Sequence, residues 1–361
     1  MKIAIIGNNG RLENTYKRDI DDLFLSCGYN TGNLVYWYAV DSHICDEKEY
    51  FGWEPDLDYI NKNFDFLIFV ASNQLNPAWD MGILGNVFDK LKIPFGLIGL
   101  GSQIDSGEYT FKQGTLKFIQ TLKNAAFVSV RGEFTADVLD KYGVNDNVYI
   151  TGCPSNFINF EKNFIKGLDY KEINKIVVNM NINGKFSSVL KNLYKQKDEY
   201  IFKYIIQDDK NIVNLCREKS IDKGVIRHLA YLFGANKKEF YNYFISNIEV
   251  FFNVECWMEF LRKFHFSFGS RMHGNMLAFQ SGVMSLFITH DNRLSELVKT
   301  MKVPHVSLEE FNNYKNITEF LKSFNFDLNE YYTRRKELLK VYLSMFEKYN
   351  IKYNGKLNNI L

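Results

Sequence analysis

Continuous runs of apolar residues, each followed by a helical pattern, constrain the fold of this chain more than any other feature. Four such runs occur in the first half: KIAIIG (2–7), FDFLIFVAS (64–72), PFGLIGLGSQ (94–103) and AFVSVRG (126–132). Uninterrupted apolar runs are typical of strands that are buried on both faces. The stretches 86–93, 114–125 and 133–144 read as helices. Strands that alternate with helices predict βα units and a largely parallel sheet.

The same alternation returns in the second half. HFSFGS (265–270) and VMSLFIT (283–289) flank a helical stretch at 271–282, and Asp291 can cap a further helix. A chain of 361 residues is long for one core and suits two domains of about 150 residues each. We therefore expect an α/β protein with two Rossmann-like domains, residues 1–160 and 161–361, that face each other across a cleft. The second domain includes a long charged helix at 329–350.

Composition and charge narrow the class of protein. The net charge is only +2, which argues against a nucleic-acid-binding protein, since these carry a strongly basic face. The five cysteines include no C-x-x-C pair, and we interpret them as reduced thiols of a cytoplasmic protein. The first residues lack a signal-peptide pattern, and no apolar stretch approaches the ~18 residues that span a bilayer. We expect a soluble protein, with at most peripheral contact with a membrane.

Three basic side chains stand where a predicted strand ends and a predicted helix begins. Arg131 follows one strand, and Arg271 and His273 follow another, with Ser270 expected to cap the second helix. Positive side chains at a helix N-terminus oppose the helix dipole, so they make better sense if an anion binds there. Two simpler explanations stay open: Arg131 forms a salt bridge with a carboxylate of its own helix, and the other two side chains are solvated.

Two loops and one further histidine are candidates to line the same cleft. Glycine lets backbone N–H groups approach a ligand closely, although both loops also fit ordinary turns. No cluster has the spacing of a metal site, and neither a P-loop nor a G-x-S-x-G motif is present, so we predict no metal. The candidates are Asn30, Gly32 and Asn33 in the first loop, Gly101, Ser102 and Gln103 in the second, and His290.

At these positions the chain resembles the polysaccharide pyruvyl transferase family. The resemblance rests on the order FVSVRGEFTADVLDKYGV, YITGCPS and SFGSRMHGNMLAFQSGVMSLFITHDNRLSEL. Arg131 matches an arginine that follows a strand in the family pattern. Arg271 and His273 match an R-x-H that opens a helix, which ends at Gly282 before an apolar strand. The glycine- and asparagine-containing loop near residue 30 is a looser match, and the similarity runs from about residue 28 to about residue 305.

The resemblance implies a fold like that of GT-B glycosyltransferases. It also implies transfer of a pyruvyl group from phosphoenolpyruvate (PEP) to two hydroxyls of a sugar in a cell-surface polysaccharide or its precursor, which gives a cyclic ketal. PEP is then the donor substrate, no separate cofactor is expected, and the acceptor is a sugar or a lipid-linked oligosaccharide. Arg131, Arg271 and His273 would bind the carboxylate and phosphate of PEP. His273 fits a general acid, because its ordinary pKa lies near neutrality, and it fits a phosphate ligand equally well.

Two other functions remain compatible with the sequence. A GT-B-type glycosyltransferase would use the same arginines to hold the diphosphate of a nucleotide-sugar. A non-catalytic glycan-binding protein on the same fold would stack aromatic side chains on sugar rings. The tryptophans available for such stacking are Trp37, Trp53, Trp79 and Trp257.

Overall fold

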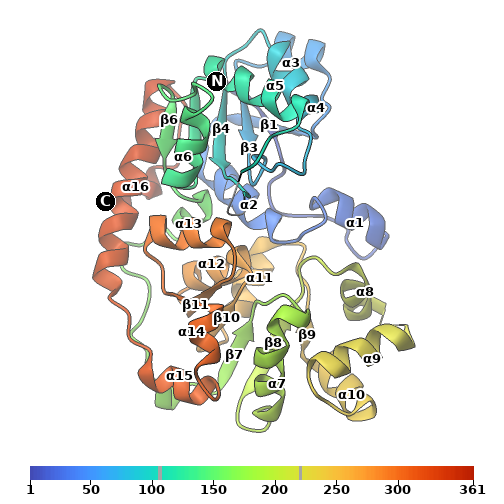
Figure 1. Cartoon of the computed structure of the whole chain (residues 1–361). Coiled ribbons are helices and arrows are strands. Elements are labelled where there is room, and N and C mark those ends of the chain that lie inside the picture. Colours follow the sequence, from blue (N-terminus) through green and yellow to red (C-terminus); the bar gives the residue numbers. More distant parts are fainter. Residues whose placement is uncertain (105–107, 219–221) are drawn as a thin grey trace.

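The computed structural model describes residues 1–104, 108–218 and 222–361, which form two α/β lobes (Figure 1). The first lobe contains β1 (Lys2–Ile6), β2 (Glu47–Phe51), β3 (Phe66–Val70), β4 (Phe95–Leu100), β5 (Phe127–Val130) and β6 (Val148–Ile150). Its helices are α1 (Ile20–Ser26), α2 (Asn33–His43), α3 (Leu57–Asn63), α4 (Gly82–Asp89), α5 (Gln113–Thr121) and α6 (Glu133–Asp140).

The second lobe contains β7 (Lys175–Val178), β8 (Ile201–Ile205), β9 (Ile248–Glu249), β10 (Phe266–Gly269), β11 (Met284–Thr289) and β12 (His305–Ser307). Its helices are α7 (Ser187–Lys195), α8 (Lys210–Glu218), α9 (Lys223–Leu232), α10 (Lys237–Asn247), α11 (Val254–Leu261), α12 (Met272–Gln280), α13 (Asn292–Met301), α14 (Leu308–Asn312), α15 (Ile317–Ser323) and α16 (Leu328–Lys348). Of the short 3₁₀ turns, η2 (Pro154–Phe157) matters most, because it lies beside the candidate site.

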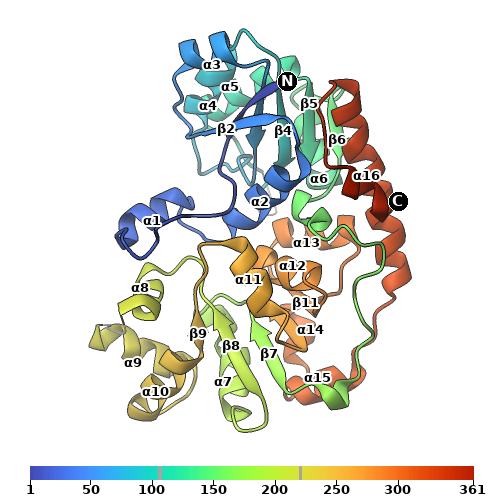
Figure 2. The ribbon, with the colours of Figure 1, turned by 180° about the vertical axis from the view of Figure 1, so that it is seen from behind.

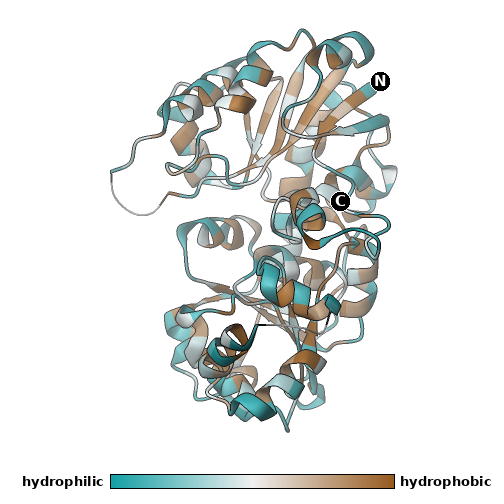
Figure 3. Ribbon diagram, turned by 90° about the vertical axis from the view of Figure 1, so that its right-hand side faces the viewer, coloured by the Kyte–Doolittle hydropathy of each residue, from teal (hydrophilic) through white to brown (hydrophobic). Residues whose placement is uncertain are grey.

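Both sheets are six-stranded, and their strand pairs are parallel. The order is β2-β1-β3-β4-β5-β6 in the first lobe and β12-β11-β10-β7-β8-β9 in the second. Numbered within its own lobe, the second sheet runs 6-5-4-1-2-3, which is the Rossmann order. The expected fold class, two Rossmann-like halves with a long C-terminal helix, is confirmed. Figure 3 shows apolar residues concentrated on the strands of both sheets.

The strand order identifies one switch point in each sheet, where connections leave in opposite directions. In the second sheet it lies between β7 and β10, and in the first between β1 and β3. Ligands of open α/β sheets bind outside the carboxyl ends of the strands at such points. At the second switch point, the N–H of Asn179, just after β7, donates to the carbonyl of Phe268 in β10 (2.9 Å). The residues that follow these two strands therefore lie side by side.

Helix α2 connects the lobes, although it belongs to the first by sequence. In Figure 2 it lies against the second lobe, above α11 and α12. Just before α2, the N–H of Thr31 donates to the carbonyl of Gln207, after β8 (2.9 Å). The apolar cluster shared by the three helices includes Leu34, Val35 and Ala39 of α2, Trp257 and Leu261 of α11, and Leu277 and Ala278 of α12.

The C-terminal helix α16 also connects both lobes, as Figure 1 shows along one side of the molecule. It packs against α13 of the second lobe and against β6 of the first. Just after α16, the hydroxyl of Tyr349 donates to the carbonyl of Ala126 in the first lobe (2.5 Å). The C-terminal segment therefore packs against both lobes. Its position at the end of the sequence did not indicate its contacts with the first lobe.

Local signals account for several helix starts, but other elements escaped the sequence patterns, among them α1, α2 and α3. The predicted cap of α13 is present, because the carboxylate of Asp291 accepts the N–H of Leu294 (2.8 Å). Strand β2 was missed because its sequence, EKEYF, lacks an apolar run and is only partly buried. The helices α8 and α9 also lie in a stretch without a clear sequence pattern. In the described part of the chain, no helix combines the length and apolar character that crossing a bilayer requires.

Candidate active site between the lobes

Arg131 is a buried cation at the carboxyl end of β5. Its side chain is only 2% exposed, and its Nε donates to the carbonyl of Gly99 (2.9 Å) while Nη1 donates to Oδ1 of Asn73 (2.6 Å). Gly99 has a φ of +83°, a conformation that glycine adopts readily. The third donor atom, Nη2, is buried and has no hydrogen-bond partner among the described residues. The salt bridge considered from the sequence is absent: among the described ion pairs, none includes Arg131.

Gly101 makes room for this guanidinium. A Cβ at Gly101 would lie 2.7 Å from Cδ of Arg131 and 3.3 Å from Oδ1 of Asn73. Any larger side chain would therefore displace one of these two groups. This assigns Gly101 a packing role at the site and accounts for the residue type there.

The N-terminus of α6 already holds an anion, which comes from the second lobe. Glu296 of α13 accepts hydrogen bonds from the backbone N–H (2.7 Å) and the hydroxyl (2.9 Å) of Thr135. Burial raises the pKa of Glu296 above its ordinary value. The helix dipole predicted an anion at the N-terminus of α6, and the carboxylate of Glu296 is that anion.

His273 lies in the first turn of α12, between the lobes. Its ring packs against Tyr36 of α2, with ring centres 5.0 Å apart, and its Nε2 lies 3.7 Å from Sγ of Cys153. Burial, together with the positive charges of Arg131 and Arg293, lowers the pKa of His273 well below its ordinary value. The imidazole is therefore neutral near pH 7 in the unliganded protein.

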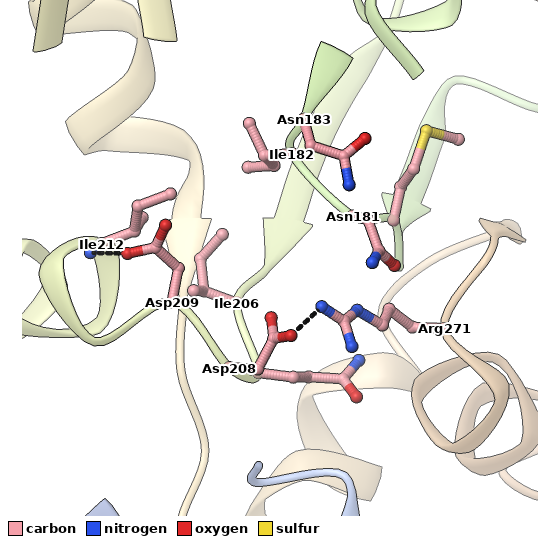
Figure 4. Close-up of a pocket in the computed structure, with 10 residues that line it drawn as sticks. Asn181, Ile182, Asn183, Ile206, Asp208, Asp209, Ile212 and Arg271 are labelled. Carbon is pink, nitrogen blue, oxygen red and sulfur yellow. Dashed lines mark hydrogen bonds and ion pairs between the residues drawn. The ribbon is translucent and has the colours of Figure 1, made fainter. Parts of the chain in front are cut away.

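Arg271 faces a different neighbour, although it is only two residues from His273. It is the N-cap residue of α12 and forms an ion pair with Asp208. The backbone of Arg271 is extended (φ −90°, ψ 106°), whereas His273 lies within the helix, so the two side chains leave the chain in different directions. Figure 4 shows Arg271 directed at Asp208, in a pocket at the carboxyl ends of β7 and β8.

This pocket, which we call the second-lobe pocket, has a volume of about 230 Å³. It lies at the switch point of the second sheet, where a ligand is expected. Its polar lining consists of amides and carboxylates together with one guanidinium. Its lining includes Asn181, Asn183, Gln207, Asp208, Asp209 and Arg271.

Ser270 does not cap α12, contrary to the prediction. Its hydroxyl donates to Oδ1 of Asn181 (3.0 Å) and accepts the N–H of the same residue (3.2 Å). The N-cap position belongs to Arg271, whose side chain makes no capping hydrogen bond. Among the described residues, no side chain caps the first N–H groups of α12, so this positive helix end could bind an anion.

The loop before α2 lies beside His273. A Cβ at Gly32 would lie 2.6 Å from Oε1 of Gln207 and 3.5 Å from Cβ of His273. Oδ1 of Asn30 accepts the N–H of Gly32 (2.8 Å), so Asn30 and Gly32 both border the site. The amide of Asn33 donates instead to the carbonyl of Cys27 (3.0 Å), which makes it a support of the loop.

The remaining predicted residues, Ser102, Gln103 and His290, do not contact Arg131 or His273 in the described part of the chain. Ser102 is buried, and its N–H donates to the hydroxyl of Thr135 (3.1 Å), while the side chain of Gln103 is exposed. His290 packs against Phe186 and lies 3.4 Å from a carboxylate oxygen of Asp291. None of the described contacts of these three residues reaches Arg131 or His273.

Three site residues were not found from the sequence: Tyr36, Arg293 and Cys153. The guanidinium of Arg131 lies 5.9 Å from the centre of the Tyr36 ring, and burial raises the pKa of Tyr36 to about 12. Arg293 adds a second positive charge near His273, besides that of Arg131. Arg293 and Cys153 follow the strands β11 and β6, so the strand-end signal could have found them, whereas Tyr36 lies inside α2 and has no such signal.

A larger pocket lies between the lobes, which we call the inter-lobe pocket, with a volume of about 720 Å³. Glu133 and Phe134 line it from the first lobe, and Glu296 lies between it and α6. From the second lobe, its lining includes Ser295, Lys299, Lys302 and Arg334. None of the site residues predicted from the sequence is among the described residues that line it. Among the described residues, no three His, Cys, Asp or Glu side chains are grouped so as to hold a metal ion.

Fold and site together define a two-lobed α/β protein with a buried cationic site between its Rossmann-like halves. The chain belongs to the polysaccharide pyruvyl transferase family, because the model of that family, Polysaccharide pyruvyl transferase, matches residues 11–292. The family suspected from the sequence is confirmed. A comparison of the sequence with curated proteins gave no match.

Several solved structures share the overall fold at low sequence identity. The complex of MnaA from S. aureus with UDP is 13% identical, with a TM-score of 0.47 over 93% of this chain and 90% of that one. A UDP-N-acetylglucosamine 2-epimerase, described as putative, from Listeria monocytogenes is 10% identical, with a TM-score of 0.49 over 96% of each chain. The fold of this chain is defined by its own strand order, and these likenesses add no functional argument.

Proposed function

We propose that this protein transfers a pyruvyl group from PEP to two hydroxyls of a sugar, in a cell-surface polysaccharide or its precursor, and forms a pyruvate ketal. The observation that carries the proposal is the buried guanidinium of Arg131, whose Nη2 has no partner. A buried charge without a partner is costly. An anionic ligand beside it would supply the missing acceptor.

The neighbouring groups favour a small ligand with two anionic groups. Arg131 and Arg293 are cationic, and the start of α12 offers backbone N–H groups without a side-chain cap. PEP carries a carboxylate and a phosphate, which these donors match. Arg271 would also bind PEP, either through the guanidinium donors that do not contact Asp208 or after its ion pair with Asp208 breaks.

The second-lobe pocket is the place we assign to the acceptor sugar. Its amides and carboxylates are suitable partners for sugar hydroxyls, which donate and accept hydrogen bonds. The carboxylates of Asp208 and Asp209 would repel a diphosphate, and this disfavours a nucleotide-sugar there. We also propose that the protein is cytoplasmic and that its acceptor is a lipid-linked oligosaccharide or another polysaccharide precursor. Any contact with the membrane would then be peripheral.

Thermal unfolding with PEP and phosphate release with sugar acceptors test the proposal. PEP should raise the melting temperature of the wild-type protein, and a panel of sugar acceptors should give PEP-dependent phosphate release. Arg271→Ala should weaken PEP binding by about 10-fold or more, since a hydrogen bond to a charged group contributes about 1.5–3 kcal/mol. Stabilisation by UDP or GDP and not by PEP would reject this function in favour of a nucleotide-sugar transferase. Glycan binding without turnover, unaffected by His273→Ala, would support a non-catalytic protein.

A further inference from the structure

A buried thiol contacts the imidazole of His273. Cys153, which directly precedes η2, has no exposed surface, and its Sγ lies 3.7 Å from Nε2 of His273. The hydroxyl of Ser155 donates to the same sulfur (3.0 Å). Because the sulfur accepts this hydrogen bond, its own S–H is free to point at Nε2. The sequence analysis interpreted the cysteines as reduced thiols and did not predict this contact.

The charged and titratable groups around the pair come from four other segments. The positive charge of Arg131 acts on Cys153, and Arg293 acts on His273. The ring of Tyr36 packs against the imidazole, and Tyr342 of α16 is near enough to Cys153 for the two groups to interact electrostatically. Burial raises the pKa of Tyr36 to about 12 and that of Tyr342 well above its ordinary value. Both phenols therefore keep their protons near neutral pH, and the thiol and the imidazole remain as the two groups able to exchange one.

We propose that Cys153 is the proton-relay partner of His273 during pyruvyl transfer, an inference that rests on the function proposed above. With the S–H directed at Nε2, the resting imidazole carries its proton on Nδ1. In the first step, the Nδ1–H bond breaks and a C–H bond forms at the methylene carbon of PEP. At the same time the S–H bond of Cys153 breaks and an N–H bond forms at Nε2. The imidazole stays neutral, and the thiol becomes a thiolate.

The proton balance closes within the reaction. The first acceptor hydroxyl forms its C–O bond to carbon 2 of PEP and gives its proton to Nδ1, while Nε2 returns its proton to sulfur. The second hydroxyl replaces the phosphate, and its proton leaves with that group. The charge of Arg131 and the hydroxyl of Ser155 stabilise the transient thiolate. Because the relay never needs a lasting imidazolium, it agrees with the lowered pKa of His273.

Substitutions at Cys153 test the relay in the full-length protein. In Cys153→Ala, kcat for PEP-dependent phosphate release should fall by about 100-fold, which is in the range of general acid–base catalysis. The KM for PEP and the PEP-induced thermal shift should stay unchanged, since the thiol acts through His273 and does not touch PEP. Cys153→Ser should keep part of the kcat that Cys153→Ala loses. It should also shift the alkaline limb of the pH–rate profile to higher pH, because a hydroxyl holds its proton more tightly than a thiol. Ser155→Ala should lower kcat by about five-fold, as expected for one lost hydrogen bond.

The exposed Cys256 of α11 provides the control, and Cys256→Ala should leave kcat and the pH–rate profile unchanged. A Cys153→Ala enzyme with kcat within about twofold of the wild type overturns the relay. The relay is also overturned if Cys153→Ala loses kcat and PEP binding equally while Cys153→Ser leaves the pH–rate profile unchanged. That combination indicates a structural role for the thiol. A wild-type protein that neither binds PEP nor releases phosphate overturns the proposed function and the relay together.

Discussion

Replacing Arg131 with lysine separates its proposed role in binding PEP from its role in packing. Lysine keeps the positive charge but ends in a compact ammonium without the planar fork of arginine. The two hydrogen bonds to Gly99 and Asn73 hold Nε and Nη1 in place. This leaves Nη2 as the donor that we assign to the ligand. In Arg131→Lys, that donor is lost while the charge remains.

The expected magnitude follows from the loss of one charge-assisted hydrogen bond. Such a bond contributes about 2 kcal/mol, which corresponds to about 30-fold in affinity. At a PEP concentration of 100 times the wild-type Kd, PEP should stabilise the wild-type protein by about 2.7 kcal/mol. At the same concentration, it should stabilise Arg131→Lys by only about 0.9 kcal/mol. Thermal or denaturant unfolding with and without PEP measures this difference.

Arg335 of α16 provides a matched control, since it is another fully buried arginine. Its three nitrogens all donate to backbone carbonyls, those of Asn156 (3.0 Å), Glu161 (2.8 Å) and Asn159. Arg335→Lys should therefore destabilise the unliganded protein and leave the PEP-induced stabilisation intact. If Arg131→Lys binds PEP as tightly as the wild type does, the free Nη2 of Arg131 is not a PEP ligand and the site assignment is wrong.

Three further predictions concern the stability and geometry of the site. Burial lowers the pKa of His43 to about 3. The unfolded chain therefore binds more protons below about pH 6.5, so stability should fall by up to about 1.4 kcal/mol per pH unit on acidification. Denaturant unfolding at pH 7 and pH 5 should show a shallower loss in His43→Gln. Glu296→Ala removes both acceptors of Thr135 and should cost about 2–4 kcal/mol in unfolding free energy, whereas an unchanged midpoint would contradict the inter-lobe capping. Gly32→Ala should lower PEP-dependent turnover at least about 10-fold by displacing neighbouring amides. Gly184→Ala is the control and should not lower it, because a Cβ there meets nothing within 4 Å. Kinetic assays of the two variants measure this difference.

Much of the fold could be predicted because its signals are local. A strand that is buried on both faces must be apolar throughout, and a helix on a sheet must repeat its apolar residues at helical spacing. These patterns gave the alternating strands and helices of both lobes. They failed at β2, a polar edge strand, because an edge strand with exposed faces does not need an apolar run.

The candidate site was predictable only in part. Arg131, Arg271 and His273 were found because each follows a strand end, which is where ligands of α/β sheets bind. The different directions of Arg271 and His273 could not be predicted, because they depend on the residue at which α12 begins: Arg271 is the extended N-cap residue and His273 lies in the first turn. The simple explanation for Arg131, a salt bridge within its own helix, was wrong, because its guanidinium bonds instead to the carbonyl of Gly99 and to Oδ1 of Asn73.

The sequence by itself determined the parallel α/β character of both halves and the positions at which cations follow strands, because both depend on contacts between near neighbours in the chain. Only the tertiary structure decided which groups meet at the site. It placed Tyr36 and Cys153 against His273, 237 and 120 residues away along the chain. It also left Nη2 of Arg131 buried without a partner. Burial and the charges of distant segments then set the pKa of His273, and these depend on packing that no local pattern of residues encodes.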